Sequence, residues 1–166
     1  MGSSEAWRDE RLKWNVSDYC GIEFIFLSIN DIWVPEITVV GAHSSEDYRE
    51  DYKKFIYVNS SGFAEFFVPT LTSTICSVEV QDFPFDHQEC DIQIMSQSFS
   101  AWLYGINATL SPSLANNATA IAVMGNGEWQ IKNVSVRSEF VDSGQEFPFQ
   151  LASVLVIITK SSLLLF

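Results

Sequence analysis

Two cysteines, Cys76 and Cys90, frame the segment that constrains this chain most, because thirteen residues separate them around an apolar turn. The turn reads Phe83-Pro84-Phe85 and is followed at once by Asp86. If the two thiols are bridged, a closed loop of this size would stabilise the fold by about 3 kcal/mol in the chain-entropy picture. Two aromatic rings at the tip of a surface loop are unusual for a soluble monomer, which rarely exposes contiguous apolar groups.

Composition describes a folded, acidic chain. Its 166 residues have the length of one domain and are enough to bury a core. A hydrophobic content of 47% with 18% charged residues argues against disorder. The net charge of -12 excludes nucleic acid as an expected partner, because phosphate binding requires clustered Lys and Arg.

Glycosylation sequons indicate the secretory pathway. Five Asn-x-Ser/Thr sequons occur, at Asn15, Asn59, Asn107, Asn117 and Asn133. Together with two cysteines at a loop spacing, they favour an oxidising, extracellular environment. If Cys76 and Cys90 pair, Cys20 is left over. We expect a buried free thiol there, with an intermolecular disulfide as the alternative.

Short alternating segments bounded by turn residues are typical of an all-β sandwich. We expect strands or extended segments at residues 22–29, 32–40, 54–58, 63–68, 70–80, 90–95, 128–137 and 147–158. A turn is expected at residues 15–21, and a second turn at residues 59–62 is expected to join 54–58 and 63–68 in a hairpin. Pro35 demotes the second of these to an edge or irregular strand. The acidic segment 43–52 and the Ser/Asn/Ala-rich segment 107–126 are expected to be loops. Three tryptophans are expected to anchor the core: Trp7, Trp14 and Trp33.

No catalytic motif is present, so an enzyme and a bound cofactor are not expected. His43 and His87 lie far apart without zinc-ligand spacing, and we interpret both as solvated loop residues. An acidic run could bind calcium but lacks the alternating spacing of a calcium loop, so a solvated face is the preferred interpretation. The run consists of Glu46, Asp47, Glu50 and Asp51.

The loop from Cys76 to Cys90, with Phe-Pro-Phe-Asp at its centre and Gln88 two residues before the second cysteine, resembles the signature loop of the Cys-loop receptors. These are pentameric ligand-gated ion channels, and Phe-Pro-Phe-Asp resembles their nicotinic, cation-channel branch. Other segments agree in order, namely residues 7–15, 32–37, 58–62 and 127–129. The resemblance implies a Cys76–Cys90 disulfide and the immunoglobulin-like β-sandwich of the extracellular ligand-binding domain.

The resemblance begins at about Trp7, and no apolar h-region of a signal peptide precedes Glu5. We therefore expect residues 1–166 to be a single ligand-binding domain without its early part. Its end is expected at the junction with the first membrane helix, with no transmembrane domain present.

In the resembled family, ligand binds between neighbouring subunits, where an aromatic box on the principal face attracts an amine by cation–π interaction. The corresponding positions here are Val40, Gln97, Val141 and Phe147, of which only Phe147 is aromatic. The family's adjacent cysteine pair falls on Ser143-Gly144, which points to a non-α or orphan subunit. The opposing, complementary face is implied at Tyr57, Glu65 and Phe67, although alternating strand aromatics can also be ordinary packing.

The resemblance also implies a gating role for the loop tip, residues 83–86, which would rest on the membrane domain, and for Lys160 at the same junction. The expected function is a subunit of a neurotransmitter-gated, cation-selective channel on the extracellular side of the cell membrane, with synapses as one location. Its partners would be homologous subunits in a homo- or hetero-pentamer and a small-molecule ligand. A soluble secreted binding protein of the same fold and an adhesion sandwich without a ligand site are the alternatives.

Overall fold

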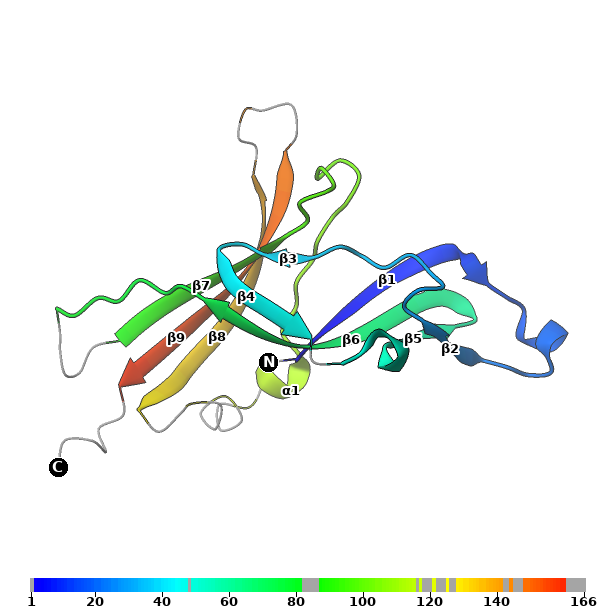
Figure 1. Ribbon diagram of the computed structural model, residues 1–166, viewed down its shortest axis with the longest axis horizontal. Coiled ribbons are helices and arrows are strands. Elements are labelled where there is room, and N and C mark those ends of the chain that lie inside the picture. Colours follow the sequence, from blue (N-terminus) through cyan, green and yellow to red (C-terminus); the bar gives the residue numbers. More distant parts are fainter. Residues whose placement is uncertain are drawn as a thin grey trace. The chain divides into compact units, whose positions relative to one another are not determined.

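The computed structural model describes residues 2–47, 49–81, 87–115, 117, 121, 125, 128–141, 144 and 148–160. Within these residues the regular secondary structure is mostly strands, which form two sheets (Figure 1). The all-β prediction is confirmed. Two sheets are also the number from which a β-sandwich, the predicted fold, is built. The chain divides into two compact units, Met1–Pro35 with Ser44–Ser73 and Glu36–His43 with Thr74–Phe166. The single domain over residues 1–166 stays a prediction.

The first unit holds a sheet in which β1, β6, β5 and β2 are neighbours in that order, while β4 also pairs with β6. The bounds are β1 Gly2–Lys13, β2 Phe24–Ser28, β4 Ala42–Asp47, β5 Phe55–Asn59 and β6 Ser61–Thr74. The pairs β1–β6, β6–β5 and β5–β2 are antiparallel.

Alternation along β5 and β6 separates a buried face from an outer face of this sheet. Ile56, Val58 and Ala64 are fully buried, and Phe66 is 4% exposed. The side chains between them, such as Tyr57, therefore lie on the opposite face, because successive strand residues point to opposite sides. This alternation produces the core of the first unit and leaves the outer face for other uses.

Two of the three tryptophans predicted as core anchors fulfil that prediction. Trp7 and Trp14 pack against the buried cluster. The Trp14 indole N–H also donates a hydrogen bond to the carbonyl of Ile22 at 2.7 Å. Trp33 is 44% exposed, with its ring edge-on to Trp7 at 6.3 Å between centroids. The prediction that Trp33 anchors the core is wrong. Trp33 lies in the irregular segment after β2, and its ring packs against Trp7 from the solvent side.

The predicted hairpin between residues 54–58 and 63–68 is confirmed as β5–β6, and the side chain of Asn59 holds its turn. Asn59 Oδ1 accepts hydrogen bonds from the Ser61 N–H at 3.0 Å, the Ser61 hydroxyl at 2.7 Å and the Phe63 N–H at 3.0 Å. Gly62 has a φ of +77°, and a Cβ there would lie 2.4 Å from the Asp9 carbonyl oxygen. A side chain at Gly62 is therefore excluded by both conformation and space.

The loop predicted at residues 43–52 is wrong in its first half, which forms β4. Backbone pairing with β6 overrides the polar composition, since most β4 side chains are exposed and can remain polar. A 3₁₀ turn, η2, follows at Asp51–Lys53.

Three of the four carboxylates in the acidic run of this segment contact Lys or Arg side chains. Asp47 contacts the Arg49 guanidinium at 3.0 Å, Asp51 contacts Lys54 at 2.8 Å, and Glu50 contacts Lys53 at 3.3 Å. Arg49 also donates to the Phe67 carbonyl at 2.8 Å. These pairs neutralise the carboxylates that a calcium ion would need.

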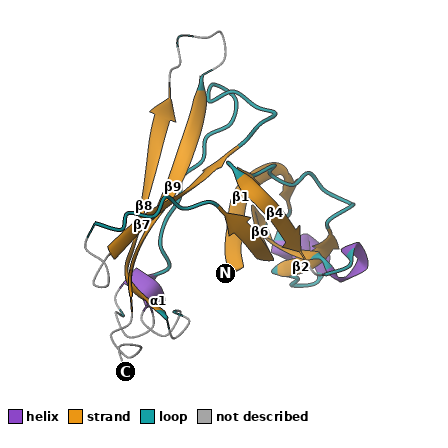
Figure 2. Ribbon diagram, turned by 60° about the vertical axis from the view of Figure 1, so that its left-hand side comes forward, coloured by secondary structure: helices purple, strands orange, loops and turns teal. Residues whose placement is uncertain are grey.

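The second unit holds a sheet of order β3-β7-β9-β8, seen at a different angle in Figure 2. Its strands are β3 Thr38–Val39, β7 His87–Met95, β8 Trp129–Val141 and β9 Phe149–Lys160. Each neighbouring pair is antiparallel. The edge position predicted for the Pro35 segment is confirmed, although only two of its residues form a strand.

The segment 107–126 was predicted as a surface loop, and its described part is more ordered than that. It contains a short helix, α1, at Pro112–Ala115. Ile121 is only 7% exposed and joins Val134 and Val156 in the core of the second unit, with Leu114 packed against them. The apolar residues are too widely spaced to show a period, so the sequence did not reveal this contribution to the core.

Two smaller predictions concern the segment after β1. The turn predicted at residues 15–21 is confirmed as the 3₁₀ turn η1, Val16–Tyr19, with Asn15 Oδ1 accepting from the Ser17 N–H. Cys20 closes the turn with a φ of 55° and is exposed, so the prediction of a buried thiol is wrong. Among the described residues, no helix has the length and apolar character needed to cross a bilayer.

Glu5 generates a test of this core. It lies in β1 opposite Phe66, and burial raises its pKa from 4.5 to about 7. Below pH 4.5 the Glu5 carboxyl is protonated in both the folded and the unfolded chain, so its burial does not lower the stability. As the pH rises toward 7, the unfolded chain releases this proton more readily than the folded chain, and the folded state loses stability. We expect Glu5→Gln to raise the free energy of unfolding at pH 8 by roughly 1–2 kcal/mol, a value reduced by the partial exposure of the side chain. At pH 4 the variant and the wild type should be equally stable.

Thermal unfolding of the chain between pH 4 and 8.5 measures this effect, with Glu23→Gln as the matched control because Glu23 is exposed. Identical pH profiles of the Glu5 variant and the wild type would contradict the assignment.

Candidate functional site

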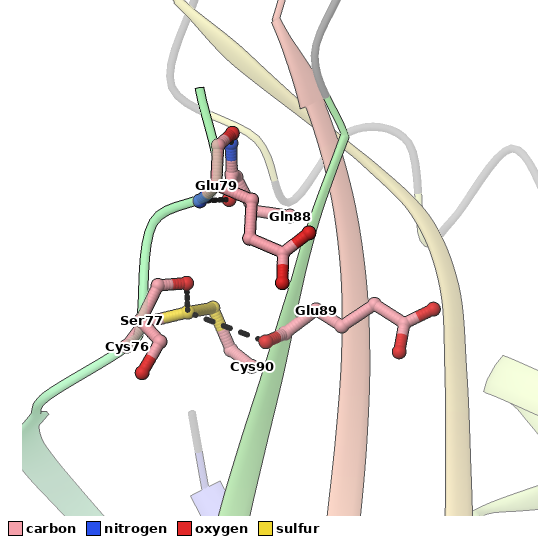
Figure 3. The surroundings of a disulfide bond; sticks show 6 residues. All are labelled: Cys76, Ser77, Glu79, Gln88, Glu89 and Cys90. Atoms are coloured by element: carbon pink, nitrogen blue, oxygen red, sulfur yellow. Dashed lines mark hydrogen bonds between the residues drawn. A yellow bond between two sulfur atoms is a disulfide. The ribbon is translucent and has the colours of Figure 1, made fainter. Parts of the chain in front are cut away.

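The two cysteines of the predicted loop form a disulfide, which joins the segment after β6 to β7 (Figure 3). Their Cα atoms are 5.2 Å apart across a sequence separation of 14. The carbonyl oxygens of Ser77 and Glu89 lie 3.7 and 3.6 Å from Cys76 Sγ. A disulfide sulfur carries no proton, so these are close contacts and not donated hydrogen bonds. The predicted Cys76–Cys90 pairing is confirmed.

Gln88 fastens the same loop at a second point. Its side chain is 2% exposed. Gln88 Nε2 donates to the Glu79 carbonyl at 2.6 Å, and Gln88 Oε1 accepts from the Glu79 N–H at 2.7 Å (Figure 3). An amide side chain is suited to this role, because it offers a donor and an acceptor side by side. The glutamine of the sequence motif therefore bridges the two arms of the loop above the disulfide.

The loop tip predicted to couple to the membrane domain, residues 83–86, lies outside the described residues. The strand that leaves it is described: β7 begins at His87, which pairs with Thr159 of β9. Lys160, the other predicted coupling residue, follows Thr159 and is opposite Trp129 of β8. The base of the tip and Lys160 therefore lie at the same end of the β7–β9–β8 ladder.

A single carboxylate organises the segment that carries Gln97. Glu36 Oε2 accepts from the Ser96 hydroxyl at 2.7 Å and from the N–H groups of Gln97 and Ser98 at 3.2 and 3.3 Å. Its other oxygen accepts from the Thr38 hydroxyl at 3.0 Å. The hydrogen bond from Ser96 is the main reason that the pKa of Glu36 is lowered. The sequence analysis did not assign Glu36 a role.

The described principal-face positions are not brought together, since Val40 and Val141 lie at or just past the ends of the two edge strands of the second sheet, β3 and β8. Val40 follows β3 and donates its N–H to the Gln93 carbonyl at 2.8 Å, while Val141 ends β8 opposite Phe149. Gln97 is exposed. Phe147 lies outside the described residues. The described positions offer no aromatic ring, so they cannot form an aromatic box by themselves.

Other aromatic side chains do lie in the same unit. Phe99 and Tyr104 are stacked at 5.6 Å between ring centroids, and Trp102 contacts Phe140 edge-on at 6.0 Å. Trp102 is 75% exposed. Phe99, Trp102 and Tyr104 could have been noticed in the sequence, since all three follow Gln97 within seven positions.

The complementary-face positions come together on the outer face of the first sheet. Tyr57 of β5 is directly opposite Glu65 of β6, and Glu65 is opposite Ala6 of β1. The Ser4 hydroxyl donates to Glu65 Oε1 at 2.6 Å. Phe67, which is 56% exposed, lies two residues further along β6. The three residues therefore share one accessible face.

Two phenylalanines that the sequence analysis did not assign to a site extend this cluster. Phe24 and Phe26 of β2 pair with Asn59 and Tyr57 of β5. Their alternation with Ile25, which packs against the core, was a sequence signal, because the outward positions of a strand are usually polar.

The predicted glycosylation sites lie at the surface. Four sequon asparagines are exposed, and Asn59 is half-buried in its turn. The exposed four are Asn15, Asn107, Asn117 and Asn133. The two histidines lie in strands, His43 in β4 and His87 in β7, so their predicted loop placement is wrong. In the described part of the chain, no three His, Cys, Asp or Glu side chains are grouped as metal ligands would be.

Comparison with known proteins defines the class of this fold. Residues 2–157 match the family described as the neurotransmitter-gated ion-channel ligand binding domain. The chain therefore belongs to this family, as the signature loop and the all-β fold predicted. Its members that resemble this chain are receptor subunits of ligand-gated channels and not enzymes.

Three relatives illustrate the range of this similarity. The chain is 31% identical over 137 residues to the acetylcholine receptor subunit epsilon of Xenopus laevis, covering 80% of this chain and 27% of the relative. It is 32% identical over 131 residues to the 5-hydroxytryptamine receptor 3B of Homo sapiens, covering 79% and 29%. It is 28% identical over 137 residues to a proton-gated ion channel subunit of Caenorhabditis elegans, covering 82% and 31%. The aligned part is under a third of each relative.

The role of Gln88 is testable. We expect Gln88→Leu to lower the free energy of unfolding by about 1–3 kcal/mol, because the Glu79 backbone groups lose their partners while the side-chain volume is nearly kept. Chemical unfolding of the oxidised chain measures the change. Gln93→Leu is the control, because the Gln93 side chain donates an exposed hydrogen bond to the Asp91 side chain and bridges no backbone groups in the described part of the loop. Equal stability of the two variants would show that Gln88 does not hold the loop.

The role of Glu36 is tested separately. We expect Glu36→Ala to increase amide hydrogen exchange at Gln97 and Ser98 by about tenfold, since each N–H loses a charged acceptor. Exchange followed by mass spectrometry or NMR provides the measurement, with Glu139→Ala on β8 as the control. Unchanged exchange at both amides would remove Glu36 as the organiser of this segment.

Proposed function

We propose that this chain is the extracellular ligand-binding domain of a subunit of a pentameric, cation-selective channel at the cell membrane. A small-molecule ligand would bind between neighbouring homologous subunits and open the pore through the signature loop. One observation carries this proposal. In a chain of the ligand-binding-domain family, the loop from Cys76 to Cys90 is held both by a disulfide and by the hydrogen bonds of Gln88. Cation selectivity is supported by the Phe-Pro-Phe-Asp sequence at the loop centre.

The arrangement of the loop supports a coupling role. The disulfide and the Gln88 amide hold the two arms of the loop together. A displacement of β7 would therefore move the whole loop and would not be absorbed by a change in the spacing of its arms. β7 is also paired along its length with β9, which ends at Lys160. Ligand would shift a two-state equilibrium by binding one state more tightly than the other.

The principal-face positions support a non-α type of subunit. Val40, Gln97 and Val141 provide no ring for cation–π attraction, and the positions of the family's adjacent cysteines hold Ser143 and Gly144. Such a subunit would contribute mainly its complementary face to a ligand site, with Tyr57 among the contacts. The three relatives are named for acetylcholine, 5-hydroxytryptamine and protons, so similarity leaves the ligand open.

The test is electrical recording from cells that express the native gene product, alone and together with homologous subunits from the same source. We expect a current evoked by one of a panel of amine transmitters, with a reversal potential that follows extracellular sodium. Cys76→Ser should abolish the current and surface expression, because an unclosed loop impairs folding and assembly.

Normal surface expression and full current in the Cys76→Ser variant would contradict the role of the loop. Secretion of a soluble product that never conducts would favour the binding-protein alternative.

A further inference from the structure

We propose that Phe24 and Phe26 of β2 join Tyr57 in a surface that binds an organic cation. In an assembled receptor this surface would supply the aromatic contacts that the principal-face positions of this chain lack. The inference rests on the proposed function and deepens it, because it identifies the rings that contact the ligand and places two of them outside the positions implied by family resemblance.

The three rings form one cluster on the outer face of the first sheet. Their centroids are 6.0 Å apart for Phe24 and Phe26, 5.5 Å for Phe24 and Tyr57, and 6.0 Å for Phe26 and Tyr57. Phe24 and Phe26 remain 51% and 62% exposed despite these contacts. The cluster is therefore a platform that is open to solvent, and mutual packing satisfies only part of its apolar surface.

A cation is the ligand that this platform suits. Cation–π attraction acts over the face of a ring, within about 6 Å of its centroid. Phe24 and Tyr57 are inclined to each other by 32°, so one cation can lie over both faces, while Phe26 is edge-on to these rings at 83° and 66° and forms a third side of the site. Quaternary ammonium groups are favoured, because their methyl groups cover the apolar rings while the charge is weakly hydrated.

The charge around the platform favours the same ligand. Glu65 of β6 is directly opposite Tyr57 and adds a negative charge to the same outer face, although its carboxylate accepts a hydrogen bond from Ser4 of β1, on the other side of β6 from the rings. Only one of its oxygens accepts the hydrogen bond from Ser4. Arg8 shares the face but is opposite Phe63, two positions along the sheet from Glu65. An overall net charge of -12 adds a long-range attraction for cations.

Titration of the purified chain with choline, followed by the NMR shift of the trimethylammonium protons, tests the inference. Rings shift these protons upfield when the group lies on their faces. We expect a saturable upfield shift, and we expect Phe24→Leu/Phe26→Leu to weaken binding by about five- to thirtyfold, as the loss of two exposed cation–π contacts would. Glu65→Gln should weaken choline binding by about two- to fivefold.

Two controls separate this site from general stickiness. Phe140→Leu removes a similarly exposed ring, 54% accessible, from the other sheet and should leave choline binding unchanged. The neutral isostere 3,3-dimethyl-1-butanol has the shape of choline without its charge and should bind about tenfold more weakly. If the double variant fails to fold, Phe26→Leu alone replaces it, because this ring is the more exposed of the two.

Three results would overturn the inference: no shift with choline up to about 50 mM, undiminished binding in the Phe24 and Phe26 variants, or equal binding of the neutral isostere. Equal binding of the isostere would identify a merely apolar contact surface. Because these titrations use the isolated chain, they can fail while ligand-evoked currents persist, and they can succeed in a chain that never forms a channel.

Discussion

The covalent closure between Cys76 and Cys90 is the constraint on which the functional account depends. It holds an irregular segment against β7, and the buried Gln88 amide adds a second fastening to the backbone of Glu79. β7 is in turn paired with β9 along most of its length. The base of the loop is therefore anchored within a sheet. A loop without these two fastenings would lose the geometry that a coupling element requires.

Alternation along the strands of the first sheet turns one face toward the core and leaves the other face for the proposed ligand. Residues such as Ile56 and Val58 face the core and are fully buried, while the residues between and beside them face outward. Their neighbours Phe26 and Tyr57 carry large apolar rings at positions where strands usually present polar groups. Exposed rings reduce solubility, and the proposed binding role would explain why a chain with a well-formed core retains them.

Sequence reasoning predicted the parts of the structure that depend on local chemistry. The disulfide was implied by the resemblance of the whole loop to a known family, and the turn held by Asn59 was indicated by its turn residues. It missed β4, whose polar residues form a strand only because β6 lies beside them, and Ile121, which reaches the core although the sequence around it shows no apolar period. Glu36 was missed for the same reason, since its partners are sixty or more residues away in the chain.

The central claim is that this chain is a receptor subunit that works in a ring of five. The most direct test is the mass of the assembled native protein, extracted in mild detergent and measured by native mass spectrometry after removal of glycans. The account predicts a particle containing five subunits, each with this ligand-binding domain or a homologous one. A stable monomer or dimer as the sole species at the cell surface would contradict it.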